Sequence, residues 1–272
     1  MTQDRNPQAE QMAHESMLRT LAAQAEALWP QELPILRSYD LPAAPRILDV
    51  GCGSGEATRR IAAAFPDADV LGVDVHAPHI EHARSAAAKL AHRVTFRTDD
   101  AYSLSLPDDS FDLVLCRHVL QAIPDAERVL EELRRVTRPG GRVHLVAEDY
   151  AMLHFHPTTM DLDRFFLDGP VAFGRKTGTD LLGGRRSPAL LRRLGFEDVR
   201  IDYATLDTER VPRSVLARIF RAWQDGYTEL LTENTPFSRD EVTLAFDEMV
   251  SCCEQEDGYA VWHLPIVSGR IP

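Results

Sequence analysis

Between residues 45 and 150 the chain alternates short unbroken apolar runs with segments that have helical spacing. Apolar runs without a helical stripe are typical of strands buried on both faces of a sheet. Their alternation with helices indicates parallel strands joined by right-handed crossovers, and hence a doubly wound α/β sheet. The predicted strands lie at 46–50, 69–75, 94–100, within 110–120 and at 142–149, and the predicted helices at 56–65, 78–90 and 125–136.

The start of the chain has a different pattern. Apolar residues recur at helical spacing over 8–29, and prolines follow at Pro30 and Pro34. Because proline removes a backbone donor and clashes with the preceding turn, the pattern predicts a helix that ends at these prolines. We therefore expect an N-terminal helical cap over 1–44.

Beyond Tyr150 the alternation stops, then resumes over 187–203. A helical stretch follows at about 211–256, with a last strand at 259–269. We therefore expect one domain over 45–272, with insertions at about 150–184 and 205–256. The predicted fold is a Rossmann-like, mostly parallel, seven-stranded sheet with helical cap insertions.

Composition narrows the classes of partner. Apolar residues make up 44% of the chain, which suits a globular core, and the formal charge is 30 − 42 = −12. An acidic chain repels nucleic acid and anionic membranes. With no long apolar stretch and no apolar run typical of a secretory signal, we expect a cytoplasmic protein without a membrane span. The four cysteines lack the spacing of a metal site or a disulfide framework.

A glycine-rich turn, Gly51-Cys52-Gly53-Ser54-Gly55, follows the first predicted strand and precedes a helix. Glycines at such a place let the backbone turn tightly and approach a ligand closely. Its G-x-G-x-G spacing differs from the G-x-G-x-x-G of dinucleotide sites. Asp49, two residues before the turn, would repel a pyrophosphate and favour an ammonium group. A purely structural strand-to-helix turn is the alternative.

The run ILDVGCGSG, Ile47 to Gly55, resembles the first motif of class I S-adenosylmethionine methyltransferases, most closely the ubiquinone-methyltransferase-like group. The likeness covers about 45–150, and more loosely continues to 203. It implies S-adenosylmethionine as cofactor, with the methionine end held around the turn. The residues implied there are Asp49, Gly51, Cys52, Gly53 and Gly55.

The resemblance also implies positions for the rest of the cofactor. Asp74 ends the second strand, about 20 residues past the turn, where a carboxylate accepts hydrogen bonds from ribose hydroxyls. Val75 follows it near the adenine, and Arg117 falls where the family contacts the methionyl group. Asp100 and Ala101 match an Asp-Ala pair that recognises adenine. Asp99 is the adjacent alternative to Asp100.

Methyl transfer from a sulfonium is an in-line displacement, which depends on positioning and requires a base only if the acceptor must lose a proton. Candidate side chains should follow the carboxyl ends of the late strands. The candidates for catalysis are His118, Asp149, Tyr150 and His154. A histidine in the core is the alternative for His118. The pair His154 and His156 fits no established metal spacing, so no metal is expected.

These features together predict an enzyme that uses S-adenosylmethionine to methylate O, N or C of a small-molecule acceptor. No basic tract indicates a macromolecular substrate, so neither a nucleic acid nor a membrane is expected as partner, and a homodimer is left open. The alternatives are an S-adenosylmethionine-binding protein on the same fold with a regulatory or non-methyltransfer role, and a nicotinamide oxidoreductase.

Overall fold

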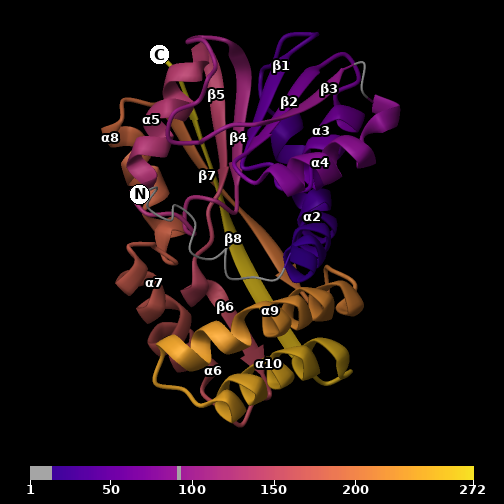
Figure 1. The fold of residues 1–272 in the computed structure, drawn as a ribbon, viewed down its shortest axis with the longest axis vertical. Helices are drawn as coiled ribbons and strands as arrows, with labels where there is room; N and C mark the ends of the chain where they lie inside the picture. Colours follow the sequence, from indigo (N-terminus) through magenta and orange to yellow (C-terminus); the bar gives the residue numbers. More distant parts are fainter. Residues whose placement is uncertain (1–13, 91–92) are drawn as a thin grey trace.

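A computed structural model describes residues 14–90 and 93–272 (Figure 1), and within them eight strands form one mixed sheet. The strand order is β3-β2-β1-β4-β5-β8-β6, and β7 pairs with the other edge of β8. Strands β1 to β5 are parallel, whereas β8 runs antiparallel to β5, β6 and β7. The strands are β1 (Arg46–Val50), β2 (Asp69–Asp74), β3 (Val94–Thr98), β4 (Phe111–Arg117), β5 (Thr137–Val146), β6 (Leu153–His156), β7 (Glu197–Asp207) and β8 (Tyr259–Arg270).

The doubly wound, mostly parallel sheet is therefore confirmed, while the prediction of seven strands is wrong by one. The extra strand, β6, lies in the segment 150–184, where its four residues pair only with the start of β8. Its residues alternate apolar and polar, but a run of four is too short to predict a strand by pattern alone, and it depends on its long neighbour. Strand β5 also begins earlier than expected, at Thr137.

Helices cover both faces of the sheet (Figure 1). The helices are α2 (His14–Arg37), α3 (Glu56–Ala64), α4 (Ala77–Ala86), α5 (Ala126–Val136), α6 (Leu162–Phe166), α7 (Ala172–Thr177), α8 (Ser187–Arg193), α9 (Arg213–Asn234) and α10 (Arg239–Glu254). Apolar residues of α3 and α4 pack on one face, and those of α5 and α8 pack on the other. None of the helices described is long and apolar enough to cross a membrane.

A third core lies among α6, α9 and α10, which gather at the end of the molecule opposite β1 (Figure 1). The single helical stretch expected over 211–256 is two helices, because Ser238 caps α10. Its hydroxyl accepts from the Glu241 amide, and the Glu241 carboxylate accepts from the Ser238 amide. The division of the chain into a cap over 1–44 and a domain over 45–272 remains a prediction.

Helix α2 continues through Pro30 and Pro34, where the sequence predicted its end. Each interior proline costs about 3 kcal/mol relative to alanine. Contacts beyond the helix compensate: the Gln31 side chain donates to the Thr205 carbonyl at 2.8 Å and accepts from the Thr205 amide at 2.9 Å. The first part of the predicted helix, 8–13, lies outside the described residues.

Candidate functional site

A cavity of about 140 Å³ opens at the carboxyl ends of β1, β2 and β4. In a doubly wound sheet this edge is where strand order reverses and loops part to admit a ligand. Val50, Asp74 and Arg117, the last residues of these three strands, all line it. Helix α2 covers one side through Gln24, and α9 covers another through Trp223.

The glycine turn forms part of the wall. Gly51, Gly53 and Gly55 all have positive φ, at 71°, 52° and 73°. The amide of Gly51 donates to the Val73 carbonyl at 2.8 Å, which fixes the turn against β2. A Cβ on Gly53 would lie 2.7 Å from Cδ1 of Leu21, so a side chain there would strain the backbone and clash with α2.

Two residues of the motif lie behind this wall. Asp49 is buried and accepts a hydrogen bond from the Thr58 hydroxyl at 2.6 Å. Burial raises the pKa of its carboxyl above the ordinary value. Cys52 is buried in the core with Ile61 and Val70. Both residues border a smaller adjoining cavity of about 20 Å³ rather than the main one.

Asp74 joins the turn to the next loop. Its Oδ2 accepts from the Gly53 amide at 2.8 Å and its Oδ1 from the His76 amide at 2.9 Å. Since a carboxylate has about four acceptor sites, both oxygens retain capacity for a ligand hydroxyl. The next residue, Val75, is 52% exposed at the cavity rim.

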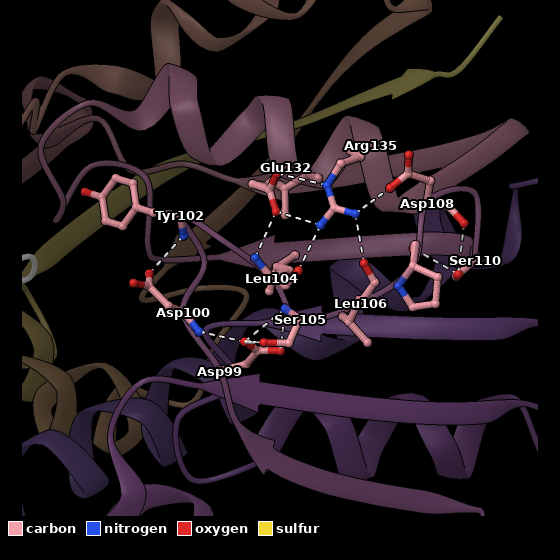
Figure 2. A network of polar contacts seen from close by, with 12 residues as sticks. Asp99, Asp100, Tyr102, Leu104, Ser105, Leu106, Asp108, Ser110, Glu132 and Arg135 are labelled. Carbon is pink, nitrogen blue, oxygen red and sulfur yellow. Dashed lines mark hydrogen bonds and ion pairs between the residues drawn. The ribbon is translucent and has the colours of Figure 1, made fainter.

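The loop after β3 separates the roles of the two adjacent aspartates (Figure 2). Asp99 accepts from Arg97 at 2.7 Å, from the Asp100 amide at 3.0 Å and from the Ser105 amide at 3.2 Å. Burial alone would raise the pKa of Asp99, but these hydrogen bonds outweigh it and lower the pKa. Asp100 accepts from the Tyr102 amide at 2.9 Å. Asp99 therefore braces the loop that carries Asp100.

Arg135 of α5 anchors the rest of this loop (Figure 2). It donates to the carbonyls of Leu104 at 2.9 Å and Leu106 at 2.8 Å, and pairs with Asp108 and Glu132. Hydrogen bonds and charges of Glu132 and Asp108 raise its pKa above the ordinary value. The loop therefore presents Asp100 and Ala101, both of which line the cavity, from a braced backbone.

Arg117, at the end of β4, is held from α2. Its Nε and Nη2 donate to the two carboxylate oxygens of Glu32 at 2.7 and 2.8 Å. His144 lies 3.0 Å from Glu32 and 2.8 Å from the Tyr39 hydroxyl, which completes a buried network. Burial alone would raise the pKa of Glu32, but Arg117 and His144 lower it to about 2. Glu32 therefore fixes the Arg117 side chain, which also borders the cavity.

His118 and Glu148 form a pair across the mouths of β4 and β5. The imidazole Nδ1 lies 2.7 Å from Oε1 of Glu148, and Gln24 of α2 donates to that same oxygen at 3.5 Å. His118 has φ +56°, and its amide donates to the Val146 carbonyl at 2.8 Å. Nε2 is buried with no hydrogen-bond partner among the described residues, and the ring lines the cavity.

The structure brings only part of the predicted catalytic set together. His118 and Tyr150 line the cavity, whereas Asp149 and His154 do not. Asp149 is fully buried and makes a bidentate pair with Arg185, at 2.5 and 2.7 Å. His154 is exposed on β6 and pairs with Asp163 at 3.0 Å.

No group of three His, Cys, Asp or Glu in the described part of the chain is arranged to hold a metal ion. His154 and His156, with Asp163 beside His154, are therefore not arranged as a metal site within those residues.

Two aromatic residues of α9, Trp223 and Tyr227, also line the cavity. Trp223 is buried in the third core. Its ring also stacks on Tyr150, with centroids 5.5 Å apart and planes 15° apart. The periodicity of α9 could not show that its apolar face turns toward the sheet edge, because that depends on how the helix docks.

Polar atoms without partners face this cavity. Thr20 Oγ1, His76 Nε2, His118 Nε2 and Gln121 Oε1 are buried and make no hydrogen bond to any described residue. Unpaired buried polar atoms cost free energy, so a concentration of them along one cavity indicates a polar ligand. Together with the glycine wall and the two aspartates, they fit a ligand with ribose hydroxyls, a base and a charged tail.

Residues 47–141 match a sequence family described as a methyltransferase domain. A probable methyltransferase of Aspergillus luteorubrus is 32% identical over 192 residues, which cover 66% of this chain and 64% of that protein. The 27-O-demethylrifamycin SV methyltransferase of Amycolatopsis mediterranei is 41% identical over 107 residues, which cover 39% of each. The chain thus spans less than two thirds of the length of these relatives.

Among solved structures, the fold is similar to that of phosphoethanolamine N-methyltransferase 2 of Haemonchus contortus in complex with S-adenosyl-L-methionine. The TM-score is 0.60 at 20% identity, and the match covers 96% of this chain and 57% of that chain. At this identity the likeness is one of fold.

Proposed function

We propose that the protein is a class I S-adenosylmethionine-dependent methyltransferase that transfers a methyl group from this cofactor to O, N or C of a small-molecule acceptor. The match of residues 47–141 to a methyltransferase domain and the two methyltransferase relatives support the proposal. The observation that carries the proposal is one cavity that joins the glycine turn, Asp74 and Asp100 to the His118–Glu148 pair. A cofactor site and a potential base thus share one space. The rifamycin relative, whose name specifies a small-molecule acceptor, supports the same class of substrate.

The residues of the cavity divide among the parts of the cofactor. Asp74 would accept hydrogen bonds from the ribose hydroxyls, since it is the last residue of β2 and lines the cavity. Asp100 and Ala101 would recognise the adenine, with Val75 at its edge. Gly51 and Gly53 would admit the methionine end.

Three further residues would act on the methionine end from behind or beside the glycine turn. Asp49, one layer deeper, places negative charge near the cofactor's cationic amine. Cys52 and Gly55 shape the turn from the core side, because they pack there against neighbouring side chains.

S-adenosylmethionine, when bound, supplies an electrophilic methyl group on a sulfonium sulfur. His118 Nε2 would take the proton that a hydroxyl acceptor loses as its oxygen forms the new bond to that methyl group. Glu148 would hold the ring and stabilise the imidazolium that results. Tyr150 and Trp223 would exclude water and orient the acceptor, and alignment itself provides much of the acceleration.

The presence of this base favours oxygen over carbon or neutral nitrogen as the methylated atom. A hydroxyl is a weak nucleophile until its proton is removed, whereas a neutral amine attacks through its lone pair without a base. The acceptor we propose therefore carries a hydroxyl group that reaches His118 Nε2.

Four finer expectations stay proposals beside this function. We place the protein nearest the ubiquinone-methyltransferase-like group on its motif ILDVGCGSG. We expect a cytoplasmic location. Because the formal charge is −12, we also expect no nucleic-acid or membrane partner. A homodimer is an assembly that we leave to measurement.

Methyl-labelled S-adenosylmethionine and a panel of small hydroxyl compounds test the function. We expect labelled product and S-adenosylhomocysteine from the wild type, and a loss of about 10²–10⁴-fold in turnover for His118→Ala. His82→Ala, at an exposed histidine of α4, is the matched control and should retain turnover. Binding of S-adenosylhomocysteine without any methylated product would favour the non-methyltransfer alternative. If His118→Ala had the same turnover as the wild type, His118 would not be the base.

A further inference from the structure

A second cavity, of about 30 Å³, lies directly behind the aromatic wall of the first. Tyr150, Trp223 and Tyr227 line both cavities, so these rings form the partition between them. The far side is built from α9 and α10, with Leu230 and Phe246 at the surface of the cavity. The second cavity is therefore separated from the first by a layer of aromatic side chains.

The lining of the second cavity is apolar throughout. Every residue around it is aliphatic, aromatic or proline, and the polar groups these carry are two phenol hydroxyls and an indole N–H. Burial raises the pKa of both Tyr150 and Tyr227 well above 10, so these hydroxyls stay neutral near pH 7. An anionic group in this space would lose its hydration and find no positively charged side chain among the described residues that line it.

The main cavity offers no free cation to an anionic acceptor either. The one arginine or lysine among the described residues that line it is Arg117. Its guanidinium is bound by both carboxylate oxygens of Glu32. A phosphate or carboxylate on the acceptor would therefore meet no available positive charge along the two cavities as described.

The backbone beside the second cavity departs from regular helix. Residues 167–171 form a π-helical turn between α6 and α7, and Pro170 of this turn lines the cavity. Such turns are uncommon and occur often at functional sites, where they widen a helix at one point. Leu167 and Asp168 of this turn are exposed, whereas its buried half, Gly169 to Val171, places Pro170 against the apolar space.

The aromatic partition is held in place from several sides. Trp223 makes edge contacts with Phe220 at 5.6 Å and with Trp262 at 5.4 Å, while Tyr150 makes one with Phe166 at 5.9 Å. A preformed wall of this kind reduces the entropy lost when a ligand is ordered against it. The partition can therefore discriminate between ligands by their shape as well as by their polarity.

We propose that the second cavity is an acceptor subsite that takes a compact, uncharged hydrocarbon group, so that the acceptor is a neutral hydroxyl compound with an alkyl or aryl substituent. The inference rests on the proposed methyl transfer and adds the class of acceptor. At about 10–15 Å³ for each water-sized group, 30 Å³ holds roughly two or three carbon atoms without movement of the walls.

Calorimetric titration of the protein saturated with S-adenosylhomocysteine tests the subsite. The probes are 4-methylphenol, 4-ethylphenol and 4-propylphenol, with 3-(4-hydroxyphenyl)propanoate as a charged analogue of similar length. We expect the dissociation constant to fall about fourfold for each added methylene. The carboxylate should bind at least about tenfold more weakly than 4-propylphenol. Equal or tighter binding of the carboxylate, or no saturable binding of any alkylphenol, would overturn the proposal.

Two variants of Leu230 test whether the alkyl group of the phenol binds in the second cavity. Leu230→Phe fills the cavity, so 4-propylphenol should bind no more tightly than 4-ethylphenol. Leu230→Ala enlarges the cavity, so 4-butylphenol should bind more tightly than 4-propylphenol. Leu244→Phe, at an exposed position of α10, is the matched control and should behave as wild type. Unchanged binding of the series in both Leu230 variants would contradict the assignment.

Affinity for S-adenosylhomocysteine is measured first in every protein. If the wild type does not bind S-adenosylhomocysteine, the proposed function is refuted. If it binds S-adenosylhomocysteine but none of the alkylphenols, the subsite alone is refuted.

Discussion

The imidazole Nδ1 of His118 lies 2.7 Å from Oε1 of Glu148, with both side chains nearly buried at 8% and 4% exposure. A carboxylate in this position keeps the proton of the neutral ring on Nδ1 and leaves Nε2 as the acceptor. The His118 ring lines the cavity, and its Nε2 is buried without a partner among the described residues. The pair therefore directs the basic nitrogen toward the place where a substrate would bind.

Glu148→Gln tests this orientation. An amide cannot favour the Nδ1–H tautomer as a carboxylate does, so ¹⁵N NMR of the imidazole should show loss of that tautomer preference. Turnover should fall by about 10²–10⁴-fold, with affinity for S-adenosylhomocysteine retained. Glu127→Gln, which alters an exposed pair with Arg193, is the control. An unchanged tautomer with unchanged turnover would show that Glu148 does not position the ring.

Replacement of Asp100 should weaken ligand binding, whereas replacement of Asp99 should lower stability. Asp100→Ala is expected to weaken S-adenosylhomocysteine binding by about tenfold, the effect of losing one good hydrogen bond to a ligand. Asp99→Ala removes the brace to Ser105 and should lower the free energy of unfolding by about 1–3 kcal/mol. Calorimetric titration and thermal denaturation separate the two effects. If Asp99→Ala weakened binding more than Asp100→Ala, their assignments would be reversed.

Arg135→Lys tests the anchor of the same loop. Lysine keeps the charge but lacks the planar fork that reaches Leu104, Leu106 and Glu132 together. We expect the free energy of unfolding to fall by about 1–2 kcal/mol, and faster hydrogen exchange over 99–106. A variant with wild-type stability and exchange would mean that the loop holds its shape without this fork.

Glu32 should make the free energy of unfolding depend on pH in the acidic range. Its pKa is about 2 in the folded protein against an ordinary value of 4.5. The ionised carboxylate therefore contributes its full stability above pH 4.5, and this contribution is lost as the pH falls from 4.5 toward 2. The loss is on the order of 3 kcal/mol.

Urea unfolding of wild type and Glu32→Gln between pH 5 and pH 2 measures the effect. The variant should be less stable at pH 7, because it leaves the buried Arg117 without its charged partner. Its stability should also change less over this pH interval than that of the wild type. Parallel pH profiles for the two proteins would contradict the assignment of the charge to Glu32.

The parallel strands, and the position of Gly51, Asp74 and Asp100 along one cavity, could be predicted from the sequence because they depend on local signals. The buried strand before Gly51, the glycine spacing and the aspartates that end or follow strands can all be recognised in short windows. Doubly wound topology then brings those windows to one edge without further information.

Features that depend on tertiary contacts could not be predicted in this way. Helix α2 continues through Pro30 because contacts with β7 and β4 outweigh a local penalty. Asp149 follows β5 as expected, yet Arg185, 36 residues further on, pairs with it away from the cavity. Trp223 lines the cavity only because α9 docks against the sheet edge.

The central claim is that the cavity binds S-adenosylmethionine through Asp74, and calorimetric titration with S-adenosylhomocysteine and with NAD tests it most directly. We expect saturable one-to-one binding of S-adenosylhomocysteine to the wild type and no measurable binding of NAD. Asp74→Ala should weaken S-adenosylhomocysteine binding by at least about tenfold, since both ribose hydroxyls lose their acceptor. Tight NAD binding without S-adenosylhomocysteine binding, or wild-type affinity in Asp74→Ala, would contradict the claim.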